Sequence, residues 1–269
     1  MKPATTDIGQ GWPHDPLQGA HLALACLDLT SLGDNDTEAD IAQLCQRAQS
    51  RFGPVAAVCV WPHLARLARA RLPDHIAVAA VANFPHGRAD VAAAVQDTLQ
   101  IVQAGAQEID LVLPYTALRA GDEAAVVRLL SAVRQACPGL LLKVILETGA
   151  LQTPQLIERA CQLSLQAGAD FLKTSTGKTA VSATPEAARL MLTAIAAHPV
   201  ARDRVGFKAS GGIKTVQDAT VYASLVRQHL GDRALDQRRF RIGASSLLAD
   251  IESVLAGQAS RPSSPHLGY

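Results

Sequence analysis

GADFLKTSTGK, residues 168–178, joins an apolar strand-like run to a loop of small and hydroxyl-bearing residues, and it carries two lysines five positions apart. Phe171 and Leu172, just before Lys173, are typical of the end of a buried strand. Residues 174–177 form a loop whose small side chains let the backbone approach a ligand closely. Lys173 is therefore expected to face a pocket rather than bulk water.

The same succession of a strand and a helix recurs eight times along the chain. The expected strands are residues 21–28, 55–60, 76–82, 108–113, 141–147, 170–174, 205–209 and 241–243. Two helix starts are well specified, because Thr153-Pro154 and Thr184-Pro185 each combine a capping hydroxyl with proline at the first helical position. Eight such pairs in about 250 residues predict a (β/α)8 TIM barrel. The absence of GxGxxG and GxxxxGK[ST] motifs disfavours a nucleotide-binding doubly wound sheet.

The composition is that of an ordinary globular protein, with 269 residues, 48% hydrophobic and 18% charged, and a formal net charge of +1. This charge offers no field to attract nucleic acid, and no apolar run is long enough to span a membrane. Five cysteines without ligand spacing favour neither disulfides nor a metal site, so we expect a cytoplasmic protein without a metal. Residues 1–269 are expected to form one domain, with a loose leader at 1–18 and a flexible tail at 259–269.

Alternate residues of a barrel strand point inward, so Lys173 fixes which side chains of the other strands share the interior. The inward side chains that carry charge are expected to be Asp28, Asp110, Lys143, Glu147, Lys173 and Lys208. A lone buried charge costs several kcal/mol, so the three lysines and three carboxylates are expected to pair with one another.

Lys208 is expected on the strand that follows the strand of Lys173, and neighbouring strands lie about 4.8 Å apart. A second ammonium group nearby lowers the pKa of Lys173 from its usual value of about 10.4. Attack on a carbonyl group requires the neutral amine, so this pair favours a nucleophilic lysine. The alternative is that one or both lysines are solvated surface charges, and their positions at strand ends argue against it.

Two consecutive loops have the composition of a phosphate site. Gly211-Gly212 follows the seventh expected strand, and Gly-Ala-Ser-Ser at residues 243–246 follows the eighth and opens a helix. In such barrels these loops and a helix N-terminus commonly hold a phosphate through backbone N–H groups. Lys178 adds a cation from the sixth loop. The alternative is that these residues are turn glycines and a serine N-cap.

Longer motifs resemble the class I deoxyribose-phosphate aldolase family, in its bacterial branch with a C-terminal tyrosine. They are LDLTSL at 27–32, NFPHG at 83–87, EIDLVLPY at 108–115, LLKVILETG at 141–149, GADFLKTSTGK at 168–178, GFKASGGIKT at 206–215 and GASSLL at 243–248. The resemblance implies a barrel that reversibly cleaves 2-deoxy-D-ribose 5-phosphate to acetaldehyde and D-glyceraldehyde 3-phosphate. It also implies a homodimer that uses no metal or organic cofactor.

The resemblance also assigns roles. Lys173 is implied to form the Schiff base, Lys208 to keep its pKa low, and Asp110 to act as the acid and base. Tyr269, the last residue, is implied to enter the active site and assist proton transfer, although composition alone would indicate a disordered end. The substrate-binding candidates are Asp28, Thr30, Cys59, Lys143, Thr176, Gly177, Lys178, Gly211, Gly212, Gly243, Ser245 and Ser246. Among them, Cys59 is as readily explained as a small buried hydrophobe.

One departure from the family concerns the phosphate. Lys214 stands where many members carry an arginine, so it offers a cation without the planar fork of a guanidinium.

Two alternative functions share most of these features. One is a different Schiff-base barrel lyase for another phosphorylated aldehyde, and the other is a phosphosugar-binding barrel without catalysis. The presence of Lys173, Lys208 and Asp110 together favours an enzyme.

Overall fold

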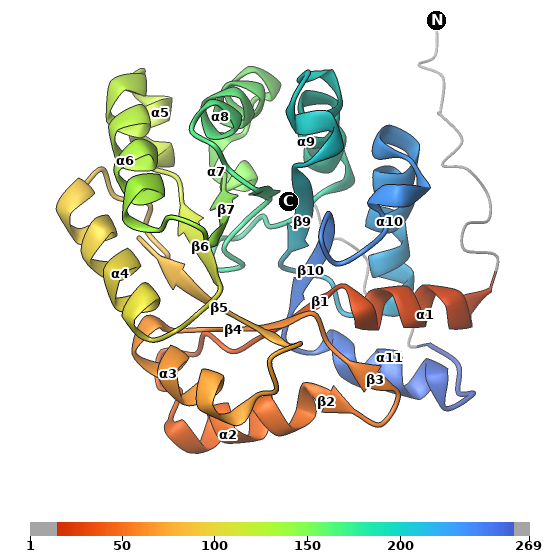
Figure 1. Ribbon diagram of the computed structural model, residues 1–269. Coiled ribbons are helices and arrows are strands. Elements are labelled where there is room, and N and C mark those ends of the chain that lie inside the picture. The colour runs from red at the N-terminus through yellow and green to blue at the C-terminus, as the bar shows by residue number, and fades with distance from the viewer. Residues whose placement is uncertain (1–14, 261–269) are drawn as a thin grey trace, which may run out of the picture.

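A closed barrel of parallel strands forms the centre of the computed structural model, which describes residues 15–260 (Figure 1). Around the barrel the strands follow chain order, and the last pairs with the first to close the sheet. They are β1 (Leu27–Thr30), β4 (Ala57–Val60), β5 (Ala77–Ala82), β6 (Glu108–Val112), β7 (Leu141–Ile145), β8 (Phe171–Lys173), β9 (Gly206–Ser210) and β10 (Phe240–Ala244). The predicted (β/α)8 TIM barrel is confirmed.

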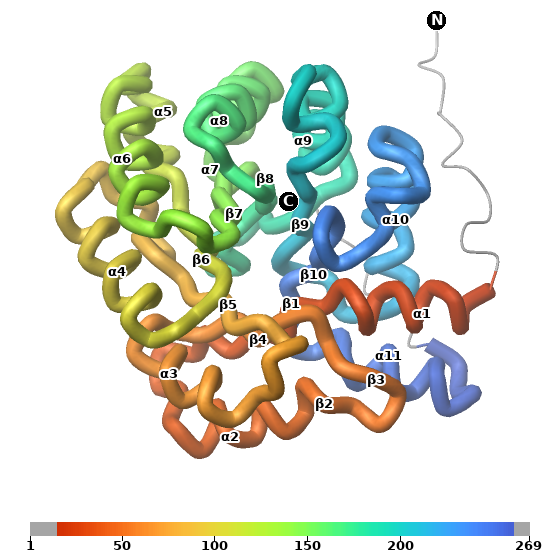
Figure 2. The backbone as a smooth tube through the Cα atoms, in the orientation of Figure 1, coloured from red at the N-terminus to blue at the C-terminus, as the bar shows by residue number. Residues whose placement is uncertain are grey.

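Helices surround the strands on the outside, as the tube in Figure 2 shows from red to blue. The principal helices are α1 (Pro16–Ala25), α2 (Glu38–Arg47), α3 (Pro62–Arg71), α4 (Val91–Gln103), α6 (Glu123–Ala136), α8 (Pro154–Gln166), α9 (Pro185–Ala197), α10 (Val216–Leu230) and α11 (Leu247–Leu255). Shorter elements are α5 (Tyr115–Arg119), α7 (Thr148–Leu151) and a hairpin of β2 (Gln49–Ser50) and β3 (Gly53–Pro54). Within residues 15–260, no helix has the length and apolar character needed to cross a membrane.

The prediction for the N-terminal segment was wrong in two respects. Helix α1 begins at Pro16, so the loose leader does not extend to residue 18, and it ends at Ala25, so the first strand does not begin at residue 21. Asp15 caps this helix through its side chain, and proline takes the first helical position. The apolar run at 21–25 fits a buried helix as well as a strand, because short apolar runs carry no distinguishing period. The helix packs against α10 and α11.

The other seven strands are where the sequence predicted them, with ends shifted by no more than two residues. Both hydroxyl-proline helix starts are also confirmed. Thr153 accepts a hydrogen bond from the backbone N–H of Leu156 at 3.3 Å, and Thr184 accepts one from Ala187 at 3.2 Å. Each cap satisfies a donor that the first helical turn would otherwise leave without a partner.

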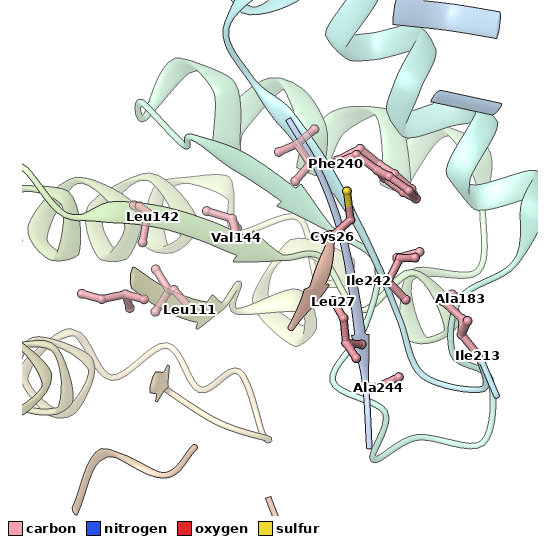
Figure 3. Packing of buried hydrophobic residues seen from close by; sticks show 14 of the residues in the cluster. Cys26, Leu27, Leu111, Leu142, Val144, Ala183, Ile213, Phe240, Ile242 and Ala244 are labelled. Carbon is pink, nitrogen blue, oxygen red and sulfur yellow. The ribbon is translucent and has the colours of Figure 1, made fainter. Parts of the chain in front are cut away.

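The two faces of each strand differ in character, and this difference positions the site. Outward-facing residues such as Leu27 on β1 and Ile242 on β10 pack in the apolar layer between barrel and helices (Figure 3). The residues between them, such as Asp28, point into the barrel, because side chains alternate along a strand. The continuous apolar layer therefore lies outside the barrel, and the inside is free to hold polar groups.

Candidate active site

Charged side chains from six strands meet inside the barrel. We call this set the charged network; it consists of Asp28 (β1), Glu108 and Asp110 (β6), Lys143 (β7), Lys173 (β8), Lys208 (β9) and Arg241 (β10). All seven are buried. Their mutual ion pairs confirm the expectation that charges in the interior pair with one another.

Asp110 lies at the centre of the network. One carboxylate oxygen, Oδ2, accepts hydrogen bonds from Lys173 Nζ and Lys208 Nζ, both at 2.7 Å, and Oδ1 accepts one from Lys143 Nζ at 2.8 Å. Burial alone would raise the pKa of this carboxyl, but Lys143, Lys173 and Lys208 outweigh burial and hold the pKa well below its usual range. Asp110 is therefore a carboxylate at neutral pH.

Asp28 and Glu108 complete the network on the other side of Lys143. Asp28 pairs with Lys208, with Lys143 at 3.3 Å and with Arg241 at 2.6 Å. Glu108 pairs with Lys143 at 2.5 Å and with Arg241 at 2.7 Å. Asp28 and Lys143, which were candidates for substrate binding, thus lie inside the network rather than on an open surface.

Lys173 and Lys208 are direct neighbours, as the strand order predicted, because they are register partners on β8 and β9. The loop after β8 is fastened to β9, since Ser175 Oγ donates to the Ser210 carbonyl at 2.6 Å and the Ser210 N–H donates to Thr174 Oγ1 at 3.0 Å. These bonds hold the two strand ends together, and with them the two lysines.

The two lysines differ in protonation. Burial and the neighbouring Lys208 lower the pKa of Lys173, and Asp110 opposes this change only in part. Burial also acts to lower the pKa of Lys208, but Asp110 and Asp28 outweigh it, so that pKa is raised. Lys208 is consequently the ammonium of the pair, and Lys173 is the lysine that loses a proton more readily.

Sequence reasoning missed Glu108 and Arg241. Glu108 stands two residues before Asp110 and therefore points to the same face of β6. The alternation of side chains along the strand could have identified it. Arg241 stands two residues before Gly243 on the last strand. Only three residues of this strand were predicted, which is too few to establish which side chains point inward.

The placement of Glu147 among these charges was wrong. Strand β7 ends at Ile145, and Glu147 adopts a left-handed conformation with φ 57° and ψ 59°, which breaks the alternation. Its carboxylate accepts hydrogen bonds from Thr176 Oγ1 at 2.5 Å and Thr179 Oγ1 at 3.1 Å. Glu147 therefore braces the loop after β8 instead of pairing with a lysine.

A cavity of about 450 Å³ lies where the strands end, and we call it the rim cavity. It is lined by Thr30, Ser31, Leu32, Gly33, Asp36, Thr176, Gly177, Lys178, Ser210, Gly211, Gly212, Ile213, Lys214, Gly243, Ala244, Ser245 and Ser246. Nine of the predicted substrate-binding residues are in this lining: Thr30, Thr176, Gly177, Lys178, Gly211, Gly212, Gly243, Ser245 and Ser246. The structure thus brings the predicted phosphate loops together around one hollow.

At two positions in the lining of the cavity, a side chain larger than that of glycine would clash with its neighbours. A Cβ at Gly211, where φ is +88°, would lie 2.6 Å from the side chain of Ser182. A Cβ at Gly243 would lie 3.0 Å from Cε of Lys208 and 2.7 Å from Oγ of Ser210. Lys208 does not line the cavity, but its side chain packs directly behind Gly243, so the charged network lies just beneath the rim.

The cavity also has the features of an anion site. Helix α11 begins at its edge with Ser246 as the N-cap, and a helix N-terminus carries partial positive charge. Lys178 and Lys214 add cations to the lining. Lys178 Nζ is 3.2 Å from Asp34 Oδ1, and this pair connects the loop after β8 with the loop after β1. Because both side chains are partly exposed, water screens the pair and an anion can compete for Lys178.

Cys59, a candidate for substrate binding, is not in the lining of the rim cavity. Its side chain is buried, and Sγ lies 3.8 Å from Asp110 Oδ2. Burial and Asp110 raise the pKa of the thiol to about 11, so it is protonated at neutral pH.

Tyr269 lies outside the described residues. Among residues 15–260, no group of three or more His, Cys, Asp or Glu side chains is arranged to hold a metal ion.

The geometry has clear relatives among solved structures. A protein from Toxoplasma gondii ME49 matches with a TM-score of 0.82 at 24% identity, over 91% of this chain and 96% of that one, which shows that the two share a fold. The tetrameric deoxyribose phosphate aldolase from Aeropyrum pernix matches with a TM-score of 0.69 at 26% identity, over 90% of this chain and 97% of that one.

Sequence comparisons are closer. The deoxyribose-phosphate aldolase of Agrobacterium fabrum is 48% identical over 257 residues, which cover 94% of this chain and 97% of the relative. The family model described as DeoC/LacD family aldolase matches residues 22–253, which include every member of the charged network. The resemblance to deoxyribose-phosphate aldolases is confirmed at the level of the family, and the chain belongs to the DeoC/LacD family of aldolases.

Proposed function

We propose that the protein reversibly cleaves 2-deoxy-D-ribose 5-phosphate to acetaldehyde and D-glyceraldehyde 3-phosphate through a Schiff base on Lys173. The observation that carries this proposal is the state of Lys173. Its buried amine shares one oxygen of Asp110 with the ammonium of Lys208, and its pKa is lowered. A buried amine that loses its proton readily is the group that attacks an aldehyde. The 48% identical relative bears the name of this activity.

The reaction begins when the neutral amine of Lys173 attacks the C1 aldehyde of the open-chain sugar. The carbinolamine that forms loses water and becomes an iminium ion. Asp110, 2.7 Å from the amine, is placed to accept and return the protons of these steps, directly or through a water molecule.

Cleavage then follows the electron demand of the iminium. Loss of the proton from the C3 hydroxyl turns it into a carbonyl, the bond between C2 and C3 breaks, and its electron pair moves toward the iminium nitrogen. Glyceraldehyde 3-phosphate leaves and a neutral enamine stays on Lys173. Protonation of the enamine at C2 restores an iminium, and its hydrolysis releases acetaldehyde and the free lysine.

The rim cavity suits the phosphate end of the sugar. Its backbone N–H groups, the N-terminus of α11, Lys178 and Lys214 offer donors and positive charge within one lining. Lys208 packs behind Gly243 of this lining, and Lys173 is the register partner of Lys208. A phosphate in the rim cavity would therefore hold the aldehyde end of the chain toward the nucleophile.

Trapping with acetaldehyde and sodium borohydride tests the nucleophile. Reduction should leave a two-carbon adduct on Lys173, because borohydride converts the iminium to a stable secondary amine. Peptide mass mapping locates the adduct. The adduct should be absent from Lys173→Leu and present in Lys178→Leu, which removes the other lysine of the same segment. An adduct on any other lysine of the wild-type enzyme would contradict the assignment.

A panel of donor aldehydes distinguishes this function from that of another Schiff-base lyase. With D-glyceraldehyde 3-phosphate as the acceptor, acetaldehyde should give the fastest carbon–carbon bond formation. Product analysis by mass spectrometry measures each rate. A clear preference for a larger donor would assign the barrel to a different phosphorylated product.

Replacement of Lys208 by leucine should shift the activity to higher pH. Removal of its positive charge leaves Asp28 and Asp110 less neutralised, so the protonated form of Lys173 is stabilised and the pKa of Lys173 rises. Since only the neutral amine attacks, we expect at least a tenfold loss of kcat/KM at neutral pH, with recovery as the pH rises. Lys208→Arg keeps the charge and should shift the profile less. An equal loss of activity by Lys208→Leu at every pH would indicate that Lys208 acts through position alone.

Tyr269 remains a prediction carried by the family resemblance. A phenol that enters the site would assist proton transfer at C2 of the enamine. Tyr269→Phe should therefore slow the exchange of the methyl protons of acetaldehyde with deuterium oxide, as followed by proton NMR. An exchange rate equal to that of the wild type would remove Tyr269 from the mechanism.

The assembly and location belong to the same proposal. We expect one domain over residues 1–269, a homodimer and a cytoplasmic enzyme; the five cysteines are free, which suits a reducing compartment. The relative from Aeropyrum pernix is described as a tetramer. Sedimentation equilibrium distinguishes these assemblies, and a monomer or tetramer would contradict the expected dimer. Fractionation of cells with an antibody against the protein tests the location.

A further inference from the structure

Arg241 is a buried cation that the steps above do not use. It lies in register with Lys208 on the neighbouring strand, and its side chain is 5% exposed. The guanidinium donates to Asp28 Oδ1 at 2.6 Å and to Glu108 Oε1 at 2.7 Å, while Nε donates to the carbonyl of Gln237. These contacts on three sides hold the group in one orientation.

Residues at the starts of β8 and β9 enclose this arginine at the end of the barrel opposite the rim cavity, which we call the floor. The ring of Phe171 lies below the guanidinium, with its centroid 5.8 Å from Cζ of Arg241. Gly206 makes room for that ring, because a Cβ there would lie 2.3 Å from Cε1 of Phe171. The guanidinium is therefore enclosed by protein rather than water, and its charge acts on the network with little screening.

The ionisable groups that share the barrel interior with Lys173 come from six other strands around the sheet. They are Asp28 on β1, Cys59 on β4, Glu108 and Asp110 on β6, Lys143 on β7, Lys208 on β9 and Arg241 on β10, whereas β5 contributes apolar Ala79 and Val81. Cys59 is neutral at ordinary pH. Within the described residues, the network thus sets four cationic side chains against three carboxylates, and one positive charge is in excess.

An enclosed site relieves such an excess by losing a proton. Arginine does not give up its proton in proteins, so the proton must come from a lysine. Carboxylate neighbours outweigh burial at Lys143 and Lys208 and raise the pKa of each. At Lys173, which pairs with Asp110, burial and Lys208 prevail and the pKa is lowered. The excess charge therefore falls on the lysine that the proposed reaction needs in its neutral form.

We propose that Arg241 is a positioning residue for the aldol reaction, which pairs with Asp28 and Glu108 and so leaves one positive charge in excess, with Lys173 as the lysine that gives up its proton. This inference rests on the proposal that Lys173 is the nucleophile. Without Arg241, three lysines would face three carboxylates and all of them would remain charged. Without Glu108, the excess would grow and Lys173 would lose its proton at lower pH.

Variants of opposite charge test the inference. The pH dependence of adduct formation on Lys173 would be measured with acetaldehyde and sodium cyanoborohydride, together with that of kcat/KM. The acidic limb of each pH profile is the rise in rate as Lys173 loses its proton. In Arg241→Met the midpoint of this limb should move up by about one pH unit, and in Glu108→Gln it should move down by about one unit. The double variant should return close to the wild type, because the two changes cancel in charge.

Controls separate charge from packing. Arg241→Lys keeps a cation at the floor, so its limb should stay near that of the wild type even if its melting temperature falls. A limb that stays in place in both single variants, or that moves in the same direction in both, would overturn the role of Arg241. Should Arg241→Met fail to fold, the downward shift in Glu108→Gln and the unshifted limb in Arg241→Lys still decide the question.

The site of the adduct keeps the two proposals apart. An adduct on Lys173 with an unmoved limb would overturn the role of Arg241 alone. An adduct on a different lysine in the wild type would overturn the proposed nucleophile, and with it the inference.

Discussion

The attraction between one carboxylate, Asp110, and three lysines is the interaction on which the rest of the site depends. Each of these groups would be costly to bury alone, and a buried charge is stable only where its partners are fixed in place. Closure of the sheet supplies that condition, because the partners come from β6, β7, β8 and β9 and cannot move apart without opening the barrel. The fold thus sets the charge state of the site as well as its shape.

Much of this could be predicted from the sequence, and the reason is periodicity. Alternation along the strands placed Asp28, Asp110, Lys143 and Lys208 inside with Lys173, and the structure finds all five there. The rule failed where the backbone leaves the strand conformation, as at Glu147, and where an apolar run fits a helix equally well, as before β1. The sequence named Lys173 as the lysine that yields its proton only through its expected closeness to Lys208 and the family resemblance, whereas the part played by Glu108 and Arg241 depends on contacts between strands far apart in the sequence.

The regions proposed for chemistry and for phosphate recognition lie at different depths in the barrel. The charged network lies buried within the strands, and the rim cavity is lined by loops rich in glycine and serine. Lys173 and Lys178 show this division, because they lie five residues apart and serve the two different regions. The positive ends of backbone dipoles and the cations Lys178 and Lys214 would offset the charge of a phosphate at the rim.

The same excess of positive charge that favours a neutral Lys173 acts again later in the proposed reaction. An iminium carries its charge at the place where the ammonium of Lys173 would carry it, so the surrounding cations disfavour both species relative to neutral ones. Cleavage of the C2–C3 bond converts the iminium to a neutral enamine, and the charge on nitrogen is already reduced in the transition state. The repulsion that prepares the nucleophile therefore also lowers the barrier to cleavage, since an interaction accelerates a step only to the extent that it differs between ground state and transition state. The same arrangement of fixed charges thereby favours both the attack by Lys173 and the cleavage of the C2–C3 bond.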